Sequence, residues 1–114
     1  MYFYEVVSMY TLIASYRGPE EKRTFVDKLF RRPGQLEYAL DLRLYQQGLS
    51  FPIQTVGFFR ARIEAGTPEI NLQRLEDNVK DIIGDGISID GAAIPDLIRV
   101  ASKDITIKLE PQKD

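Results

Sequence analysis

The sequence predicts one α+β domain with the element order strand, helix, strand, strand, helix, strand. Two observations predict this order: apolar and polar residues alternate along several stretches, as in half-buried strands, and two proline-containing helix starts separate these stretches. The chain has 114 residues, of which 44% are apolar, and this is enough for one hydrophobic core. We therefore expect a single domain over residues 1–110, followed by a polar tail over residues 111–114.

The first predicted strand and helix follow each other near the N-terminus. Tyr2–Tyr16 is dense in aromatic and β-branched side chains, which favour a strand. The helix is predicted to begin at Pro19, because proline suits the first helical position and the acidic pair Glu20–Glu21 complements the positive end of a helix. Apolar residues three and four positions apart give this helix one buried face, and Arg31–Gly34 closes it.

Two further strands are predicted to form a hairpin. Along Leu36–Tyr45 every second residue is apolar, and this period of two outweighs the good helix propensity of leucine. Gln46–Pro52 has the composition of a loop, and Ile53–Ala65 alternates again. We therefore expect these two strands to pair antiparallel.

The second helix has clear start and stop signals. Thr67 is the predicted N-cap residue and Pro68 lies in the first turn. Gly84 supplies a left-handed residue, so the helix should end near Ile83. The residues predicted on its buried face are Leu72, Leu75, Val79, Ile82 and Ile83.

Beyond this helix the sequence leaves two candidates for the last strand. Ile87–Asp90 and Asp104–Leu109 both alternate, and Pro95–Ser102 between them is predicted to be a short helix. Either strand completes the element order of the ferredoxin-like βαββαβ fold. That fold is a four-stranded antiparallel sheet with two helices on one face, here with a C-terminal extension, and its other face is left for a partner.

The composition argues against catalysis. The chain contains no Cys and no His, which removes the commonest metal ligands and the commonest general base near neutral pH. Asp81, Asp85, Asp90 and Asp96 form a loose carboxylate cluster without the ligand spacing of a calcium loop, so a helix stop followed by a turn explains them better. We predict a protein that is not an enzyme and has no cofactor, no metal site and no small-molecule substrate.

The N-terminal segment does not predict a membrane or secretory role. Met1–Tyr16 is apolar, but it contains Glu5, lacks a basic leader and a small-residue cleavage site, and is too short to span a bilayer. We therefore expect this segment to be part of the fold and no membrane to be a partner.

The third strand supplies the main candidate binding residues. Because side chains alternate along a strand, Phe58, Arg60 and Arg62 are predicted on the face opposite the helices. An aromatic ring beside two guanidinium groups suits RNA, through base stacking and bidentate bonding to phosphate. The alternative is an ordinary solvated strand face on which Glu64 completes a pattern of charges.

Three short motifs occur in an order that is typical of one protein family. Tyr4–Val6 lies in the first predicted strand, Gln47–Ile53 lies between the middle strands, and Gly57–Phe59 enters the third strand. In this order and spacing the chain resembles protein six of the bacterial-type small ribosomal subunit, over roughly residues 1–83. The fold of that family is the same βαββαβ arrangement.

The resemblance implies a structural component of the small ribosomal subunit that binds ribosomal RNA together with ribosomal protein eighteen and has no catalytic activity. It places Tyr4 near RNA, and the loop Gln46–Ile53 near both RNA and the protein partner. Tyr2 and Phe3 stand where the family commonly has basic residues, and such divergence suits a mitochondrial ribosome. The expected location is the ribosome, in the mitochondrial matrix or the bacterial cytoplasm. The predicted RNA-binding residues are Tyr2, Tyr4, Arg43, Gln46, Gln47, Phe58, Arg60 and Arg62.

Two other functions stay open on the sequence alone. A ferredoxin-like sheet with an apolar open face often pairs with a copy of itself, so a non-catalytic self-assembling or small-molecule-binding regulatory module is the first alternative. A carboxylate-dependent enzyme that uses the region Asp81–Asp96 is the second.

Overall fold

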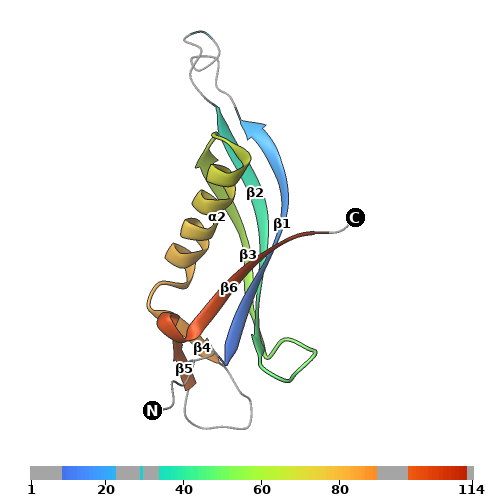
Figure 1. Cartoon of the computed structure of the whole chain (residues 1–114), viewed down its shortest axis with the longest axis vertical. Coiled ribbons are helices and arrows are strands. Elements are labelled where there is room, and N and C mark those ends of the chain that lie inside the picture. The colour runs from blue at the N-terminus through green and yellow to red at the C-terminus, as the bar shows by residue number, and fades with distance from the viewer. Residues whose placement is uncertain (1–8, 23–28, 30–33, 90–97, 113–114) are drawn as a thin grey trace, which may run out of the picture.

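The computed structural model of the chain describes residues 9–22, 29, 34–89 and 98–112. Its elements are β1 (Tyr10–Lys22), β2 (Gln35–Gln46), β3 (Gln54–Glu64), α2 (Pro68–Ile83), β4 (Gly86–Ile89), β5 (Ile98–Ala101), the 3-10 helix η1 (Ser102–Asp104) and β6 (Ile105–Pro111). The described part of the chain is therefore mostly β-structure, and α2 is the α-helix that it covers over its whole length (Figure 1).

The strands form two sheets. The larger sheet has four strands in the order β3-β2-β1-β6, and β4 and β5 form a separate antiparallel pair. Within the larger sheet β2 is antiparallel to both β1 and β3, whereas β6 is parallel to β1. The sheet is therefore mixed, and α2 runs along one side of it (Figure 1).

The predicted ferredoxin-like fold is wrong. That fold needs a fully antiparallel sheet in which the first and second strands are separated by a third. Here β1 and β2 are direct neighbours, from Tyr10 opposite Gln46 to Lys22 opposite Gln35. The chain thus builds a three-stranded antiparallel meander first. Only then does it cross over through α2, and this long connection lets β6 run parallel to β1.

The start and end of β1 differ from the prediction. Residues 2–8 of the expected strand lie outside the described residues, and β1 continues to Lys22, beyond the helix start expected at Pro19. The register shifts between Arg17 and Glu20, and Gly18 at this bulge has a φ of +122°. A Cβ atom on Gly18 would lie 2.9 Å from the backbone oxygen of Glu37, so the bulge requires glycine. The rest of the expected helix falls on residues 23–28 and 30–33, outside the described ones.

The predicted hairpin of β2 and β3 is confirmed. Its register runs from Gln35 opposite Glu64 to Leu42 opposite Gly57, and then shifts, because Arg43 lies opposite Thr55. One residue of β3 is therefore extra at this bulge. Gly57 has a φ of +145° there, a conformation that residues with a side chain rarely adopt. The bulge directly precedes Phe58.

The predicted second helix is also confirmed. Thr67 is the N-cap residue, and its Oγ1 accepts a hydrogen bond of 3.3 Å from the backbone N of Ile70. Pro68 is the first helical residue, and α2 ends at Ile83 before Gly84, whose φ is +55°. The local sequence signals alone thus define both ends of α2.

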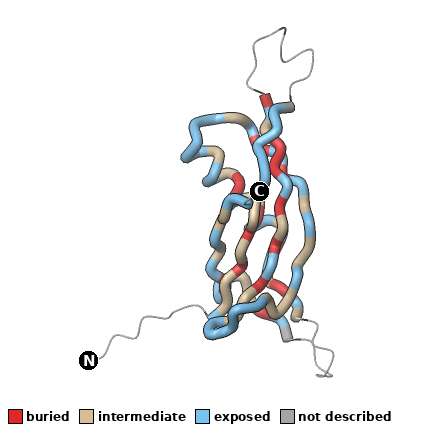
Figure 2. The backbone as a smooth tube through the Cα atoms, turned by 90° about the vertical axis from the view of Figure 1, so that its right-hand side faces the viewer, coloured by how far each residue is buried: buried red, intermediate tan, exposed pale blue. Residues whose placement is uncertain are grey.

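One side of α2 packs against the sheet. Leu75, Val79 and Ile83 are buried and Ile82 is partly buried, as the apolar spacing predicts. Leu72 is 41% exposed, so its predicted place on the buried face is wrong. The core lies between α2 and the sheet face below it, and its buried positions recur along the strands (Figure 2). Its members are Leu12, Ala14, Tyr38, Leu40, Leu42, Leu44, Ala61, Ile63, Leu75, Val79, Ile83, Ile87, Val100 and Ile105.

The C-terminal region resolves the choice between two last strands. β6 joins the main sheet, whereas the strand that begins at Gly86 pairs with β5. The short helix expected over Pro95–Ser102 is wrong for Ile98–Ala101, because this stretch forms β5 opposite β4; residues 90–97 lie outside the described ones. Pro111 ends β6, and the backbone N of Gln112 donates to Tyr16 O at 2.8 Å, so the expected polar tail begins as part of the sheet.

The buried phenol of Tyr38 should make the folded state less stable at alkaline pH. Burial raises the pKa of Tyr38 above the ordinary value of 10.0, and the neighbouring Tyr16, whose ring lies edge-on at 5.9 Å, raises it further. Because the pKa is higher in the folded state, this contribution is complete below about pH 10 and is lost as pH rises through the folded pKa. We expect Tyr38→Phe to lose less free energy of unfolding than the wild type between about pH 9 and about pH 11.5. Urea denaturation across this range measures it, and equal losses would contradict the burial of the phenol.

Candidate nucleic-acid interface

The face of the main sheet that points away from α2 carries the predicted binding residues, and we call it the open face. Along β3, Ala61 and Ile63 are buried against the core, so the residues between them point the other way. Phe58 is 76% exposed, and the side chains of Arg60 and Arg62 are 83% and 62% exposed. The predicted placement of these three residues on one uncovered face is confirmed.

Glu37 on β2 positions the two arginines of β3. It lies directly opposite Arg62, whose Nε donates to Glu37 Oε2 at 2.9 Å. Nη1 of Arg60 lies 3.7 Å from Glu37 Oε1. Glu37 is only 9% exposed, whereas both arginine side chains reach solvent. A desolvated carboxylate therefore orients two guanidinium groups that stay available at the surface.

A second acid and arginine pair lies further along β2. Nε of Arg43 donates to Asp41 Oδ1 at 3.3 Å, and its Nη2 lies 3.2 Å from Oδ2. The side chain of Asp41 is 15% exposed and is held by both of its oxygens. Asp41 also lies directly opposite Phe58 in the register of β2 and β3. The carboxylate and the aromatic ring are therefore neighbours on the open face.

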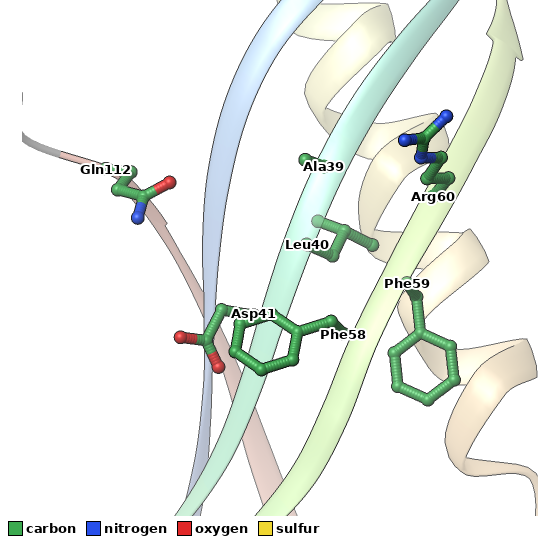
Figure 3. A pocket seen from close by; sticks show the side chains of 7 residues that line it. All are labelled: Ala39, Leu40, Asp41, Phe58, Phe59, Arg60 and Gln112. Atoms are coloured by element: carbon green, nitrogen blue, oxygen red, sulfur yellow. The ribbon is translucent and has the colours of Figure 1, made fainter.

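A hollow of about 220 Å³ opens beside this ring, and we call it the Phe58 hollow. Figure 3 shows Phe58 next to Asp41, and Gln112 in the C-terminal segment at the side of the sheet. The small side chain of Ala39 leaves room between Asp41 and Arg60. The complete lining is Ala39, Leu40, Asp41, Phe58, Phe59, Arg60 and Gln112.

A second hollow of about 260 Å³ adjoins the first, and we call it the Arg17 hollow. The two hollows share Ala39 and Arg60. Arg17 enters from the strand next to β2, just before the bulge at Gly18. The open face therefore has an aromatic hollow and a hollow with two arginines side by side. The lining of the second is Arg17, Gly18, Glu20, Glu37, Ala39 and Arg60.

The structure brings together only part of the predicted RNA-binding set. Arg43 lies on the open face with the β3 residues. It is two residues after Asp41 on β2, so the two side chains point to the same face. Gln46 is the last residue of β2 and Gln47 lies in the turn, where its backbone N donates to Met9 O at 2.8 Å. At strand spacing Gln46 lies about 17 Å along β2 from Asp41 and Gln47 lies beyond it, so both are away from the Phe58 hollow. Tyr2 and Tyr4 lie outside the described residues.

Four residues of this surface were not predicted: Glu37, Asp41, Arg17 and Gln112. The alternation of β2 places the two acids on the face opposite its leucines, so part of the signal was present. What the sequence does not contain is the register that sets Glu37 opposite Arg62 and Asp41 opposite Phe58. Arg17 and Gln112 reach the hollows through pairings of β1 that are distant in sequence.

The turn between β2 and β3 forms an apolar tip at one end of the sheet. Leu49 and Phe51 are exposed there, Phe51 to 60%, and Met9, just before β1, is exposed as well. The backbone hydrogen bond from Gln47 to Met9 O joins the turn to this strand. The tip belongs to the loop that the family resemblance places near a protein partner.

The acidic region considered for catalysis does not assemble into a metal site within the described residues. Asp81 lies on α2 and Asp85 lies in the turn that follows it, whereas Asp90 and Asp96 fall outside the described part. Over the residues with described positions, no group of three or more acidic side chains is placed to hold a metal ion. The same residues contain no helix with the length and apolar character needed to cross a membrane.

No protein-family model, curated protein or solved structure matches the chain. The resemblance to the ribosomal family therefore stays a prediction that rests on the three motifs. The candidate site must be judged on its own geometry.

The buried carboxylate of Glu37 gives a prediction about stability. Glu37→Gln keeps the shape of the side chain but removes the charge that faces Arg60 and Arg62. We expect it to lower the free energy of unfolding by about 1–3 kcal/mol, because a buried charge-assisted hydrogen bond becomes weaker. Glu64→Gln is the matched control on the next strand, and its exposed side chain should cost no more than about 0.5 kcal/mol. Equal effects in urea denaturation would show that Glu37 does not hold the arginines.

Proposed function

We propose that the chain is a non-catalytic binding protein whose open face binds single-stranded RNA. The observation that carries the proposal is Phe58, an aromatic residue of β3 that is 76% exposed and stands beside exposed arginines. A base stacked on this ring would cover apolar area that water now contacts. The sugar and phosphate groups next to that base would then lie within reach of Arg60 and Arg17.

The charges of the open face balance, although its guanidinium groups reach solvent. Four arginines lie there with four acidic residues: Arg17, Arg43, Arg60 and Arg62 with Glu20, Glu37, Asp41 and Glu64. The chain as a whole has a net charge of −2, which opposes non-specific attraction to nucleic acid. Binding therefore depends on local contacts with a few phosphates and on stacking.

A single strand suits this face better than a duplex. Stacking on Phe58 requires a base whose face is free, and the bases of a duplex are already stacked on each other. The two adjoining hollows, with volumes of about 220 Å³ and about 260 Å³, are small enough for single nucleotide groups. The partner we propose is therefore an unpaired segment or loop of RNA.

RNA binding to the wild type and to two variants tests the proposal. We expect Phe58→Ala to weaken binding of a labelled ten-nucleotide single-stranded RNA by about 5- to 150-fold, since one stacked base contributes about 1–3 kcal/mol. The double variant Arg60→Gln and Arg62→Gln should reduce the slope of log Kd against log salt by about 0.7 for each phosphate that it no longer neutralises. Fluorescence anisotropy at several salt concentrations measures both.

Two matched controls accompany this test. Phe51→Ala removes an exposed phenylalanine from the apolar tip, and Arg99→Gln removes an exposed arginine from β5, outside the main sheet. Both should bind RNA within twofold, or about 0.4 kcal/mol, of the wild type. The proposal is contradicted if the wild type binds no RNA, or if the controls weaken binding as much as the open-face variants do.

A narrower form of the proposal is a structural role in the small ribosomal subunit, beside ribosomal protein eighteen. The three sequence motifs support it, and the exposed Leu49 and Phe51 offer apolar surface to a protein neighbour. The βαββαβ fold of that family does not support it, since the main sheet is built in a different order. This narrower role therefore depends on the motifs, whereas the RNA-binding face depends on the placement of side chains.

Sedimentation of native extracts tests the ribosomal setting separately. In gently lysed source cells we expect the full chain to sediment with small ribosomal subunits at low salt. It should dissociate as salt rises, because each phosphate contact is weakened by salt. Chain that stays at the top of the gradient at every salt concentration would end the ribosomal proposal and leave the binding of isolated RNA unaffected.

A further inference from the structure

We infer that β6 is the interface of a symmetric dimer, in which the β6 strands of two copies of the chain pair antiparallel and join their main sheets. The inference goes beyond the proposed RNA binding, because it concerns the edge of the sheet and not its open face. β6 is an outer strand of the main sheet, with β1 as its neighbour on one side. Among the described residues no strand pairs with its other side.

The outer side of β6 carries backbone groups that a further strand can use. The backbone N of Gln112 donates to Tyr16 O, so the backbone groups of Gln112 point toward β1. Backbone groups alternate along a strand, and those of Ile107, Leu109 and Pro111 therefore point away from β1. The first two offer both an N–H and a C=O there, whereas proline offers only its C=O. The end of β6 leads away from α2, which leaves this side open to a second strand (Figure 1).

β6 suits pairing with another chain better than β3, the strand at the opposite edge of the sheet. The register of β6 with β1 is continuous from Ile105 to Pro111. β3 instead contains the bulge before Phe58 and the exposed side chains of Arg60 and Arg62. A bulge and several like charges on an edge strand both oppose pairing with a second chain. The regular edge of β6 has neither of these features.

The charges of β6 select a second copy as the partner and fix the register. Nζ of Lys108 lies 3.2 Å from Oε1 of Glu110, and the two side chains are 63% and 43% exposed. In an antiparallel pair centred on Leu109, Lys108 of each copy lies directly opposite Glu110 of the other copy, so the charges attract. Centring the pair on Lys108 would set two lysines opposite each other. Centring it on Ile107 would set Asp104 opposite Glu110.

The same register also suits the backbone and the apolar side chains. Leu109 lies opposite Leu109 of the other copy, and the two residues exchange N–H to C=O hydrogen bonds. Ile107 lies opposite Pro111 of the other copy, so the proline serves only as an acceptor and ends the pairing. Ile107 and Leu109 are partly buried against the core, and pairing would cover more of their apolar area. Because the paired stretch is short, we expect a weak dimer.

The symmetry of this dimer leaves the open face uncovered. The two-fold axis of an antiparallel β6 pair is perpendicular to the sheet, so both copies keep their open faces on the same side. The α2 helices of both copies lie on the other side. Dimer formation and RNA binding therefore use different surfaces, and each can be measured without the other.

Analytical ultracentrifugation of the full chain without RNA tests the inference. We expect the wild type to sediment as a monomer at about 5 µM and mainly as a dimer at about 500 µM. Lys108→Glu and Glu110→Lys each set like charges opposite each other, so each should raise the Kd of the dimer by about tenfold. Lys103→Glu is the matched control, because it makes the same change of charge in η1, outside the paired stretch. Its Kd should stay within about twofold of the wild type.

Two combinations of the charge variants report the contact between copies. In an equal mixture of Lys108→Glu and Glu110→Lys, each chain carries like charges at the two positions, and opposite charges meet only between the two kinds of chain. This mixture should form a heterodimer with a Kd within about threefold of the wild type. The double variant Lys108→Glu with Glu110→Lys should recover as well, because the exchange restores both contacts in the register centred on Leu109.

The possible outcomes separate this inference from the proposed function. A wild type that stays monomeric up to about 500 µM overturns the dimer and leaves RNA binding by the open face unaffected. A dimer that the single variants form as tightly as the wild type, or a mixture that does not recover, overturns β6 as the interface. Recovery in the mixture without recovery in the double variant overturns the register centred on Leu109.

Discussion

The alternation of side chains along β2 is the constraint on which the rest of the structure depends. β2 lies between β1 and β3, and its leucines at positions 40, 42 and 44 are almost completely buried under α2. The residues between them, including Glu37 and Asp41, must then point to the open face. A slip of one residue would exchange the two faces, burying the carboxylates in the core and exposing the leucines. The burial that stabilises the sheet thus also fixes the acids that position the arginines.

Those acids explain how a chain with a negative net charge can present a surface for an anion. A carboxylate as little exposed as Glu37 is unfavourable unless it is paired, and Arg62 satisfies it at 2.9 Å. The same contact holds a long side chain in one orientation, so less conformational entropy is lost when that side chain binds a ligand. Because the arginines are paired with carboxylates, the net charge of the open face is small, and its non-specific attraction for anions is weak. Recognition then depends on geometry, which favours discrimination between ligands over affinity for all of them.

The parts of the fold that were predicted correctly are those that neighbouring residues determine. The period of two along β2 and β3, the cap at Thr67 and the glycine after α2 are all local signals. Pro19 and the two glutamates after it are also a local signal for a helix, but pairing with β2 makes them part of a strand. Tertiary contacts outweighed propensity there, as they often do. The open face of β3 was predictable for the same local reason, whereas the partners of Phe58 and Arg62 depend on a register that single-strand patterns do not contain.

The topology that contradicted the predicted fold is also what completes the candidate site. In a fully antiparallel sheet a last strand beside β1 would run the other way and end next to Tyr10. Because β6 runs parallel to β1, its end lies beside Tyr16, and Gln112 reaches the Phe58 hollow. The crossover through α2 therefore does more than cover the core. It brings the C-terminal end of the sheet to the same surface as the β2–β3 hairpin, so that an aromatic ring, a carboxylate and an amide from three separate parts of the chain line one hollow.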